Sequence, residues 1–220
     1  MFKDLFDKLF KKQQKSIPDR IKETQKELFP KPKKDDGLMR MSKRGMIELA
    51  GHEGVVLSKY KCSAGVWTVG IGATHSVVPD LHKWPMDKTI TIEEAFKLFR
   101  KSLEGYENSV RKALTVEVNQ NVFDALVSWC YNVGKAAPRR STVVRLINKG
   151  VPQDSKKLYN ALLMWKKPKS IINRRTKEAK LMTTGKCSNK GRVTIYPVSP
   201  KGKPLFREGQ TINASKYLEG

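Results

Sequence analysis

A glycine-rich segment near residue 60 constrains the fold more than any other part of the chain. It reads GHEGVVLSKYKCSAGVWTVGIG from Gly51 to Gly72. The preceding SKRGMIELAGHEG begins with a serine, spaces its apolar residues as a helix does, and ends at Gly54, where glycine is a favoured helix stop. The residues after Gly54 are rich in β-branched and aromatic types, which predicts a short antiparallel hairpin. We therefore expect a helix that leads directly into a small sheet.

The chain beyond this hairpin has helical apolar spacing over most of its length. TIEEAFKLFRKSLEGYENSVRKAL starts with a capping arrangement, and NQNVFDALVSWCYNVG is apolar enough for a central buried helix. Three further helices are predicted in STVVRLINKG, QDSKKLYNALLMW and INRRTKEAKLMTTG. The last 35 residues, 186–220, alternate β-forming residues with Pro and Gly turns, which predicts a small β appendage or arm. The expected fold is α+β and mainly helical, with one domain over residues 41–185.

Residues 1–40 have a different residue pattern from this domain. Apolar residues recur at helical spacing along residues 2–12, opposite a Lys and Asp face, which predicts a short amphipathic helix. Such a stripe packs on its own domain or a partner protein, or lies on an anionic membrane or lipopolysaccharide surface. The segment PKPKKDDG at residues 30–37 is typical of a linker.

The composition excludes several classes of protein. The chain has 220 residues, of which 39% are hydrophobic, and runs such as ALLMW are far shorter than a membrane span requires. The N-terminus lacks the features of a secretory signal, so we expect a protein that accumulates in a cytoplasm. The three cysteines, Cys62, Cys130 and Cys187, are too widely spaced for a disulfide framework or a metal site. We expect reduced thiols and neither a metal nor another cofactor.

The charge of the chain is strongly positive. Forty-four Lys and Arg residues oppose 21 Asp and Glu residues, which gives a formal net charge of +23. A charge of this size attracts polyanions. Nucleic acid, anionic lipid and an anionic cell wall all satisfy this requirement, and the charge alone does not choose between them.

Three polar residues in the glycine-rich segment, together with three later blocks, resemble a known family. Glu53, Cys62 and Thr68, followed by Gly70 and Gly72, resemble the active-site element of the phage-type lysozymes, the muramidases that include T4 lysozyme and many phage endolysins. In that family a Glu ends the first helix, and an Asp or Cys and then a Thr lie on the following hairpin. The blocks QNVFDALVSWCYNVG, RRSTVVRLINKG and INRRTKEAKLMTTG resemble the later helices of the family in the same order. The resemblance covers residues 41–185.

The resemblance implies a lysozyme-like fold and hydrolysis of the β-1,4 bond between N-acetylmuramic acid and N-acetylglucosamine in peptidoglycan. Such cleavage needs a proton for the leaving oxygen and a nucleophile at the sugar carbon. Glu53 is the expected acid, and partial desolvation beside Val55 and Val56 would keep it protonated near neutral pH. Cys62, where many members carry Asp, would direct or deprotonate a water that Thr68 also holds. We favour this inverting route, while attack on the sugar by the Cys62 thiolate stays an alternative.

The resemblance also assigns supporting residues. Arg174 matches an arginine that reaches across the cleft to the catalytic Glu, where it would act against the effect of burial. Tyr131 and Asn132 match positions that line the sugar cleft, and Ser141 is a further candidate for substrate binding. We expect His52 to be a surface residue at the helix end.

Two other functions stay open at this point. One is a lysozyme-like fold without catalysis that binds cell wall or nucleic acid, and the other is membrane disruption by residues 1–15. A negatively charged cell wall explains the basic charge without a specific nucleic acid partner. We expect a monomer held in the host cytoplasm until lysis, with carriage in a virion as the alternative.

Overall fold

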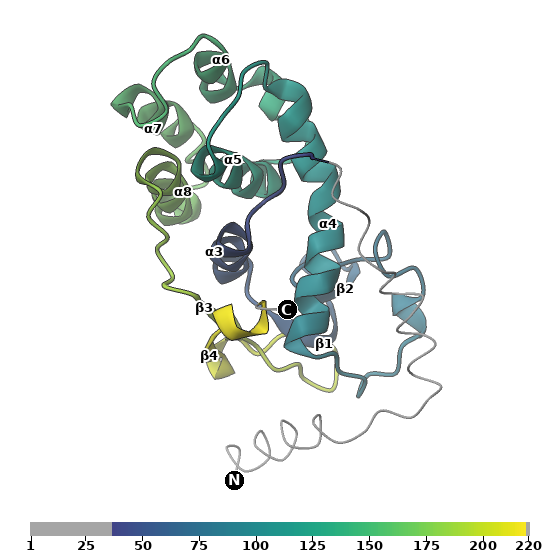
Figure 1. Cartoon of the computed structure of the whole chain (residues 1–220). Helices are drawn as coiled ribbons and strands as arrows, with labels where there is room; N and C mark the ends of the chain where they lie inside the picture. The colour runs from purple at the N-terminus through teal and green to yellow at the C-terminus, as the bar shows by residue number, and fades with distance from the viewer. Residues whose placement is uncertain (1–36, 219–220) are drawn as a thin grey trace. The chain divides into compact units, whose positions relative to one another are not determined.

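The computed structural model describes residues 37–218, which belong to one compact unit (Figure 1). The amphipathic helix predicted at residues 2–12 and most of the predicted linker lie outside the described residues. None of the helices within residues 37–218 combines the length and the hydropathy that crossing a membrane requires.

The described part is mainly helical, with two small antiparallel sheets. Its helices are α3 (Lys43–Glu53), α4 (Ile92–Ala113), α5 (Gln120–Val133), α6 (Thr142–Asn148), α7 (Lys156–Leu163) and α8 (Ile172–Thr184). Its strands are β1 (Val56–Lys61), β2 (Trp67–Gly70), β3 (Arg192–Ile195) and β4 (Gln210–Asn213). The α+β class predicted from the sequence is confirmed.

Local sequence signals set the helix ends. The Ser42 side chain accepts a hydrogen bond from the backbone N–H of Gly45 and so caps α3. Thr91 and Glu94 form the reciprocal capping box predicted for α4. Gly54 ends α3 with φ of 78°, a conformation that L-residues with a side chain rarely adopt. These caps fix the point at which α3 gives way to the hairpin.

Helix α5 forms the centre of the helical half of the unit. All residues from Val122 to Cys130 are buried, so this part of α5 is covered on every side. Helix α5 packs against both α8 and α4. The long helix α4 contacts both α5 and β2, so it connects the helical half to the hairpin (Figure 1). The predicted hairpin is present, with Tyr60 opposite Thr68 and Lys61 opposite Trp67.

The segment after α8 returns to the helix that precedes the hairpin. The buried carboxylate of Glu48, on α3, accepts hydrogen bonds from the backbone N–H groups of Ser188 and Asn189. Farther along, β3 runs beside Val55, whose N–H donates to the carbonyl of Thr194 at 2.9 Å. The chain between Glu48 and Val55 is therefore held on one side by residues 188–196.

Candidate active site

An ion pair joins the end of α3 to α8. Arg174 Nη1 donates to Glu53 Oε1 at 2.6 Å, with the Arg174 side chain 12% exposed and the Glu53 side chain 28% exposed. Glu53 is the last residue of α3, so its side chain lies where the helix meets the hairpin. Among the hydrogen bonds within residues 37–218, those of Glu53 use Oε1.

Cys62 and Thr68 lie close together on the hairpin. Cys62 follows β1, and its N–H donates to the Val66 carbonyl at 3.0 Å, which closes the turn. Thr68 is buried in β2, and its hydroxyl donates to the same carbonyl at 3.0 Å. Slight burial acts to raise the pKa of the Cys62 thiol, but hydrogen bonds from the Val66 and Ala64 backbone and the Thr68 side chain outweigh it, and the net pKa is lowered. The turn therefore makes the Cys62 thiol a stronger acid than an unperturbed thiol.

The charges of Glu53 and Cys62 both act on the Tyr60 phenol. The negative charges of both residues, after the larger effect of burial, raise the pKa of Tyr60 to about 12. Burial and then the charge of Glu53 also raise the pKa of Tyr131, on α5. The hydroxyl of Tyr131 donates to the Ile71 carbonyl at 3.2 Å. The charge of Glu53 thus acts on both Tyr60 and Tyr131, whereas that of Cys62 acts on Tyr60.

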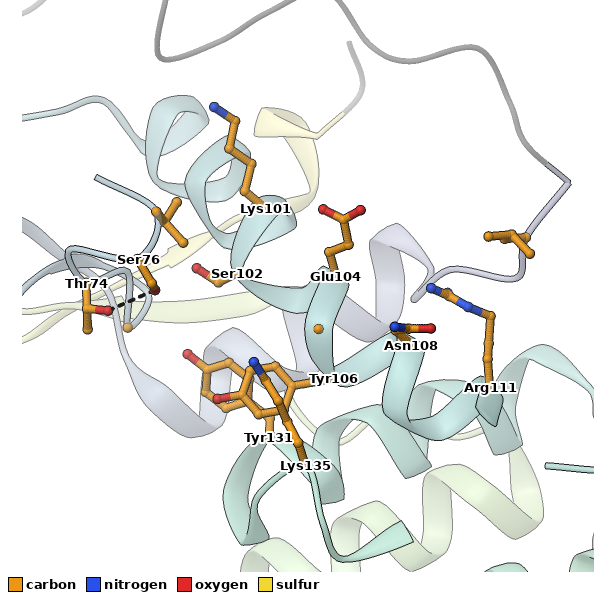
Figure 2. Close-up of a pocket in the computed structure, with 14 residues that line it drawn as sticks. Thr74, Ser76, Lys101, Ser102, Glu104, Tyr106, Asn108, Arg111, Tyr131 and Lys135 are labelled. Carbon is orange, nitrogen blue, oxygen red and sulfur yellow. Dashed lines mark hydrogen bonds between the residues drawn. The ribbon is translucent and has the colours of Figure 1, made fainter. Parts of the chain in front are cut away.

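A pocket of about 670 Å³ lies between α4 and the loop after β2, and Tyr131 is part of its lining (Figure 2). Glu53, Cys62 and Thr68 are not among the residues that line it. Tyr131 and Tyr106 pack with ring centroids 4.8 Å apart, and Lys135 Nζ lies 4.9 Å from the centre of the Tyr106 ring. Thr74 and Ser76 line the opposite side, where their hydroxyls are 3.1 Å apart. Two aromatic faces and several hydroxyls suit a polar ring with apolar C–H faces, such as a sugar.

The remaining predicted residues occupy different environments. Asn132 lies at the end of α5, and its Oδ1 accepts a hydrogen bond of 2.6 Å from Arg175 Nη2. Ser141 is buried as the N-cap of α6, where its hydroxyl donates to the Pro138 carbonyl and accepts from the Val144 N–H. The Ser141 hydroxyl is therefore engaged in capping, and its contact with substrate stays a prediction. Within residues 37–218, no group of three or more His, Cys, Asp or Glu side chains is arranged to hold a metal ion.

The expectation that His52 is a surface residue was wrong. Its side chain is 8% exposed, and Nε2 is buried without a hydrogen-bond partner. Burial, followed by the charges of Arg174, Lys177 and Arg175, lowers the pKa of His52 to about 3. Since α3 packs against α5 and β3, position at the helix end was a poor guide to exposure.

Comparisons with known proteins agree with this geometry. Residues 50–178 match the family described as phage lysozyme. The chain belongs to the phage lysozyme family. It is thus a glycoside hydrolase by family. The endolysin of Salmonella phage P22 is 34% identical over 148 residues, which cover 66% of this chain and 98% of that protein. The endolysin of Bacillus phage B103 is 32% identical over 183 residues, which cover 80% of this chain and 66% of that protein.

The similarity extends to three dimensions. The crystal structure of a P22 lysozyme mutant superposes with a TM-score of 0.59 and 31% sequence identity, covering 67% of this chain and all of that one. The endolysin of Escherichia coli O157:H7 phage FAHEc1 gives a TM-score of 0.58 at 28% identity, covering 68% of this chain and 97% of that one. This phage lysozyme family member therefore has the lysozyme-like fold that its sequence predicted.

Several residues at the site were not anticipated from the sequence. Tyr106 and Lys135 come from different elements and meet only through packing of α4 against α5. Tyr60 lies between Lys59 and Lys61 on β1. Because successive residues of a strand point to opposite faces, this alternation is the one sequence signal that places Tyr60 on the other face from the two lysines.

Proposed function

We propose that this phage lysozyme is a muramidase that hydrolyses the β-1,4 bond between N-acetylmuramic acid and N-acetylglucosamine in host peptidoglycan. The observation that supports this most strongly is the Glu53–Arg174 pair beside a hairpin that carries Cys62 and Thr68. A carboxyl group at the end of α3 and a thiol of lowered pKa on the hairpin supply the acid and the base that glycoside hydrolysis requires.

The reaction follows from these two groups. Protonated Glu53 donates its proton to the glycosidic oxygen as the bond to the sugar carbon breaks. A water held by Cys62 and Thr68 attacks that carbon from the opposite face, and the proton it loses passes to the Cys62 thiolate. Transfer of this proton to solvent, and uptake of one by Glu53, restores the enzyme. This route inverts the sugar centre, whereas attack by the thiolate itself would retain it.

The pocket lined by Tyr106 and Tyr131 supports binding of the glycan. Tyr106 and Tyr131 offer ring faces to a sugar, and Asn132 offers an amide to an N-acetyl group. The charge of +23 favours the negatively charged cell wall over long range. We further propose that the protein acts on this wall at host lysis.

Mass spectrometry of digested, purified peptidoglycan tests the reaction. We expect new reducing N-acetylmuramic acid ends with the unmodified protein and none with Glu53→Gln. Anhydro ends would indicate a transglycosylase, and binding without cleavage would indicate a wall-binding module. Either outcome contradicts the proposed hydrolysis. The configuration of the first product, read by NMR, separates the inverting route from the retaining one.

A further inference from the structure

Arg174, the partner of Glu53, is itself held by a buried carboxylate on the same helix. Glu178 is 1% exposed and accepts hydrogen bonds from Arg174 Nε at 3.0 Å and from Ser128 Oγ at 2.8 Å. Arg174 Nη2 donates to the Ser128 carbonyl at 3.2 Å. Since Nη1 is bound to Glu53, all three nitrogens of the guanidinium group have partners. Its plane is therefore fixed relative to α5 as well as α3.

Glu178 also holds a second arginine. Arg175 is completely buried, and its Nη1 donates to Glu178 Oε2. Its Nε donates to the Trp165 carbonyl at 3.1 Å, and its Nη2 reaches Asn132 Oδ1 at 2.6 Å. One carboxylate thus contacts both the arginine that holds the acid and the arginine that holds a proposed sugar-binding amide.

The charges in this network balance. When Glu53 is ionised, the negative charges of Glu53 and Glu178 and the positive charges of Arg174 and Arg175 alternate and sum to zero. Burial raises the pKa of Glu178, and the charges of Arg174 and Arg175 act against that rise. Two permanent cations at hydrogen-bond distance stabilise Glu178 as a carboxylate.

The other titratable groups around Glu53 do not offset the charge of Arg174. They are His52 on α3, Tyr60 on β1, Tyr106 on α4, Tyr131 on α5 and, through His52, Lys177 on α8. The three tyrosines have raised pKa values and His52 a lowered one, so these four side chains are neutral near neutral pH. Arg174 is the cation in contact with Glu53, and Glu178 is the anion in contact with Arg174.

We propose that Glu178 is a positioning residue for the reaction, which orients Arg174 against Glu53 and Arg175 against Asn132 and offsets the positive charge of Arg174 at the acid. This inference rests on the proposed role of Glu53 as proton donor. Without the charge of Glu178, Arg174 would favour loss of the Glu53 proton at a lower pH.

The variant Glu178→Gln tests the proposal, because it keeps the side-chain size and removes the charge. We expect kcat on purified peptidoglycan to fall about 10 to 100-fold. The basic limb of the kcat–pH profile should move to lower pH by about 1 unit. The charge of Glu178 is separated from Glu53 by the Arg174 side chain and acts on it through a partly buried medium. KM should rise severalfold because Arg175 loses its anchor and releases Asn132. The matched control is Glu117→Gln, an exposed carboxylate between α4 and α5, which should leave the profile unchanged.

A second variant gives a prediction of opposite sign and covers the case in which Glu178→Gln does not fold. Arg175→Gln leaves Glu178 with one cation, so the basic limb should move to higher pH while KM still rises. If Glu178 has a purely structural role, both variants should have a lower melting temperature and the same basic limb of the kcat–pH profile as the unmodified protein. That result would overturn the proposal. If the unmodified protein releases no reducing ends, it is the proposed muramidase function that fails.

Discussion

Arg174 Nη1 donates to Glu53 Oε1 at 2.6 Å, although 121 residues separate the two in the chain. This contact joins the proposed acid, at the end of α3, to α8. We expect Glu53→Gln to lower kcat by about 1,000-fold, in the range that loss of a general acid produces. Arg174→Lys, which keeps the charge and loses the fork, should lower kcat by about 10-fold. Release of reducing sugar is the measurement, and loss of activity in the exposed control Glu208→Gln would show that the effect is not specific.

Cys62 should be the most reactive of the three cysteines. Its pKa is lowered, whereas burial raises the pKa of Cys130 to about 12 and also raises that of Cys187. Because the thiolate is the nucleophile, iodoacetamide at pH 7.5 should label Cys62 first and abolish wall hydrolysis in step with labelling. Peptide mass spectrometry identifies the labelled residue. Complete labelling of Cys62 with full activity retained would exclude it from the mechanism.

Replacement of the thiol should change the pH dependence of the enzyme. If the thiolate accepts a proton, activity rises with pH as Cys62 ionises. Cys62→Asp should keep substantial activity and move the acidic limb to lower pH, because a carboxyl group ionises about 4 units below a thiol. Cys62→Ala should lose most of the activity. An acidic limb at the same pH in the Asp variant would contradict the role of Cys62 as base.

Gly72 permits the close approach of Tyr131. It has φ of +77°, and a Cβ atom there would collide with the Tyr131 hydroxyl. Gly72→Ala should cost about 1 kcal/mol for the backbone and displace a proposed sugar-binding ring, so we expect KM to rise severalfold. Gly150→Ala is the matched control, since it has φ of +75° and no atom within 4 Å of the added carbon. An equal change in KM for both variants would show that the clash with Tyr131 has no role.

The buried carboxylate of Glu48 should anchor residues 188–189. Glu48→Ala leaves the N–H groups of Ser188 and Asn189 without their acceptor, which should lower the free energy of unfolding by about 3 kcal/mol. Urea denaturation followed by fluorescence measures this. Glu117→Ala, at an exposed position, provides the comparison and should change stability little. Equal stability of the two variants would mean that these hydrogen bonds contribute nothing net.

The buried imidazole of His52 should make the protein sensitive to acid. Its pKa is about 3 in the folded protein and 6.5 as the ordinary value, so between these two pH values the unfolded chain binds more protons. The free energy of unfolding should therefore decrease as the pH is lowered below 6.5. His52 should account for about 3 kcal/mol of this decrease by pH 4. His52→Gln should flatten this part of the curve, while His75→Gln, at an exposed position, should not. Parallel curves for all three proteins would refute the assignment.

Features of the fold that depend on neighbouring residues were readable from the sequence. The Thr91–Glu94 capping box, the Gly54 stop and the hairpin that follows it depend on interactions within a few residues, so local spacing predicts them. The helix end that carries Glu53 and the hairpin that carries Cys62 and Thr68 followed in the same way, whereas the roles of these three residues were assigned by resemblance to the family. Arg174 was assigned by resemblance to the family, because no local pattern relates it to Glu53.

The tertiary structure decided which side chains are buried and which charges meet. Sequence alone determined that this chain forms a lysozyme-like set of helices around a hairpin with an acid and a thiol. It did not determine that His52 is buried, that Tyr106 meets Tyr131, or that Glu178 supports both Arg174 and Arg175. Burial and long-range ion pairs depend on which helix faces pack together, and the residues that determine a given contact are spread over the whole chain.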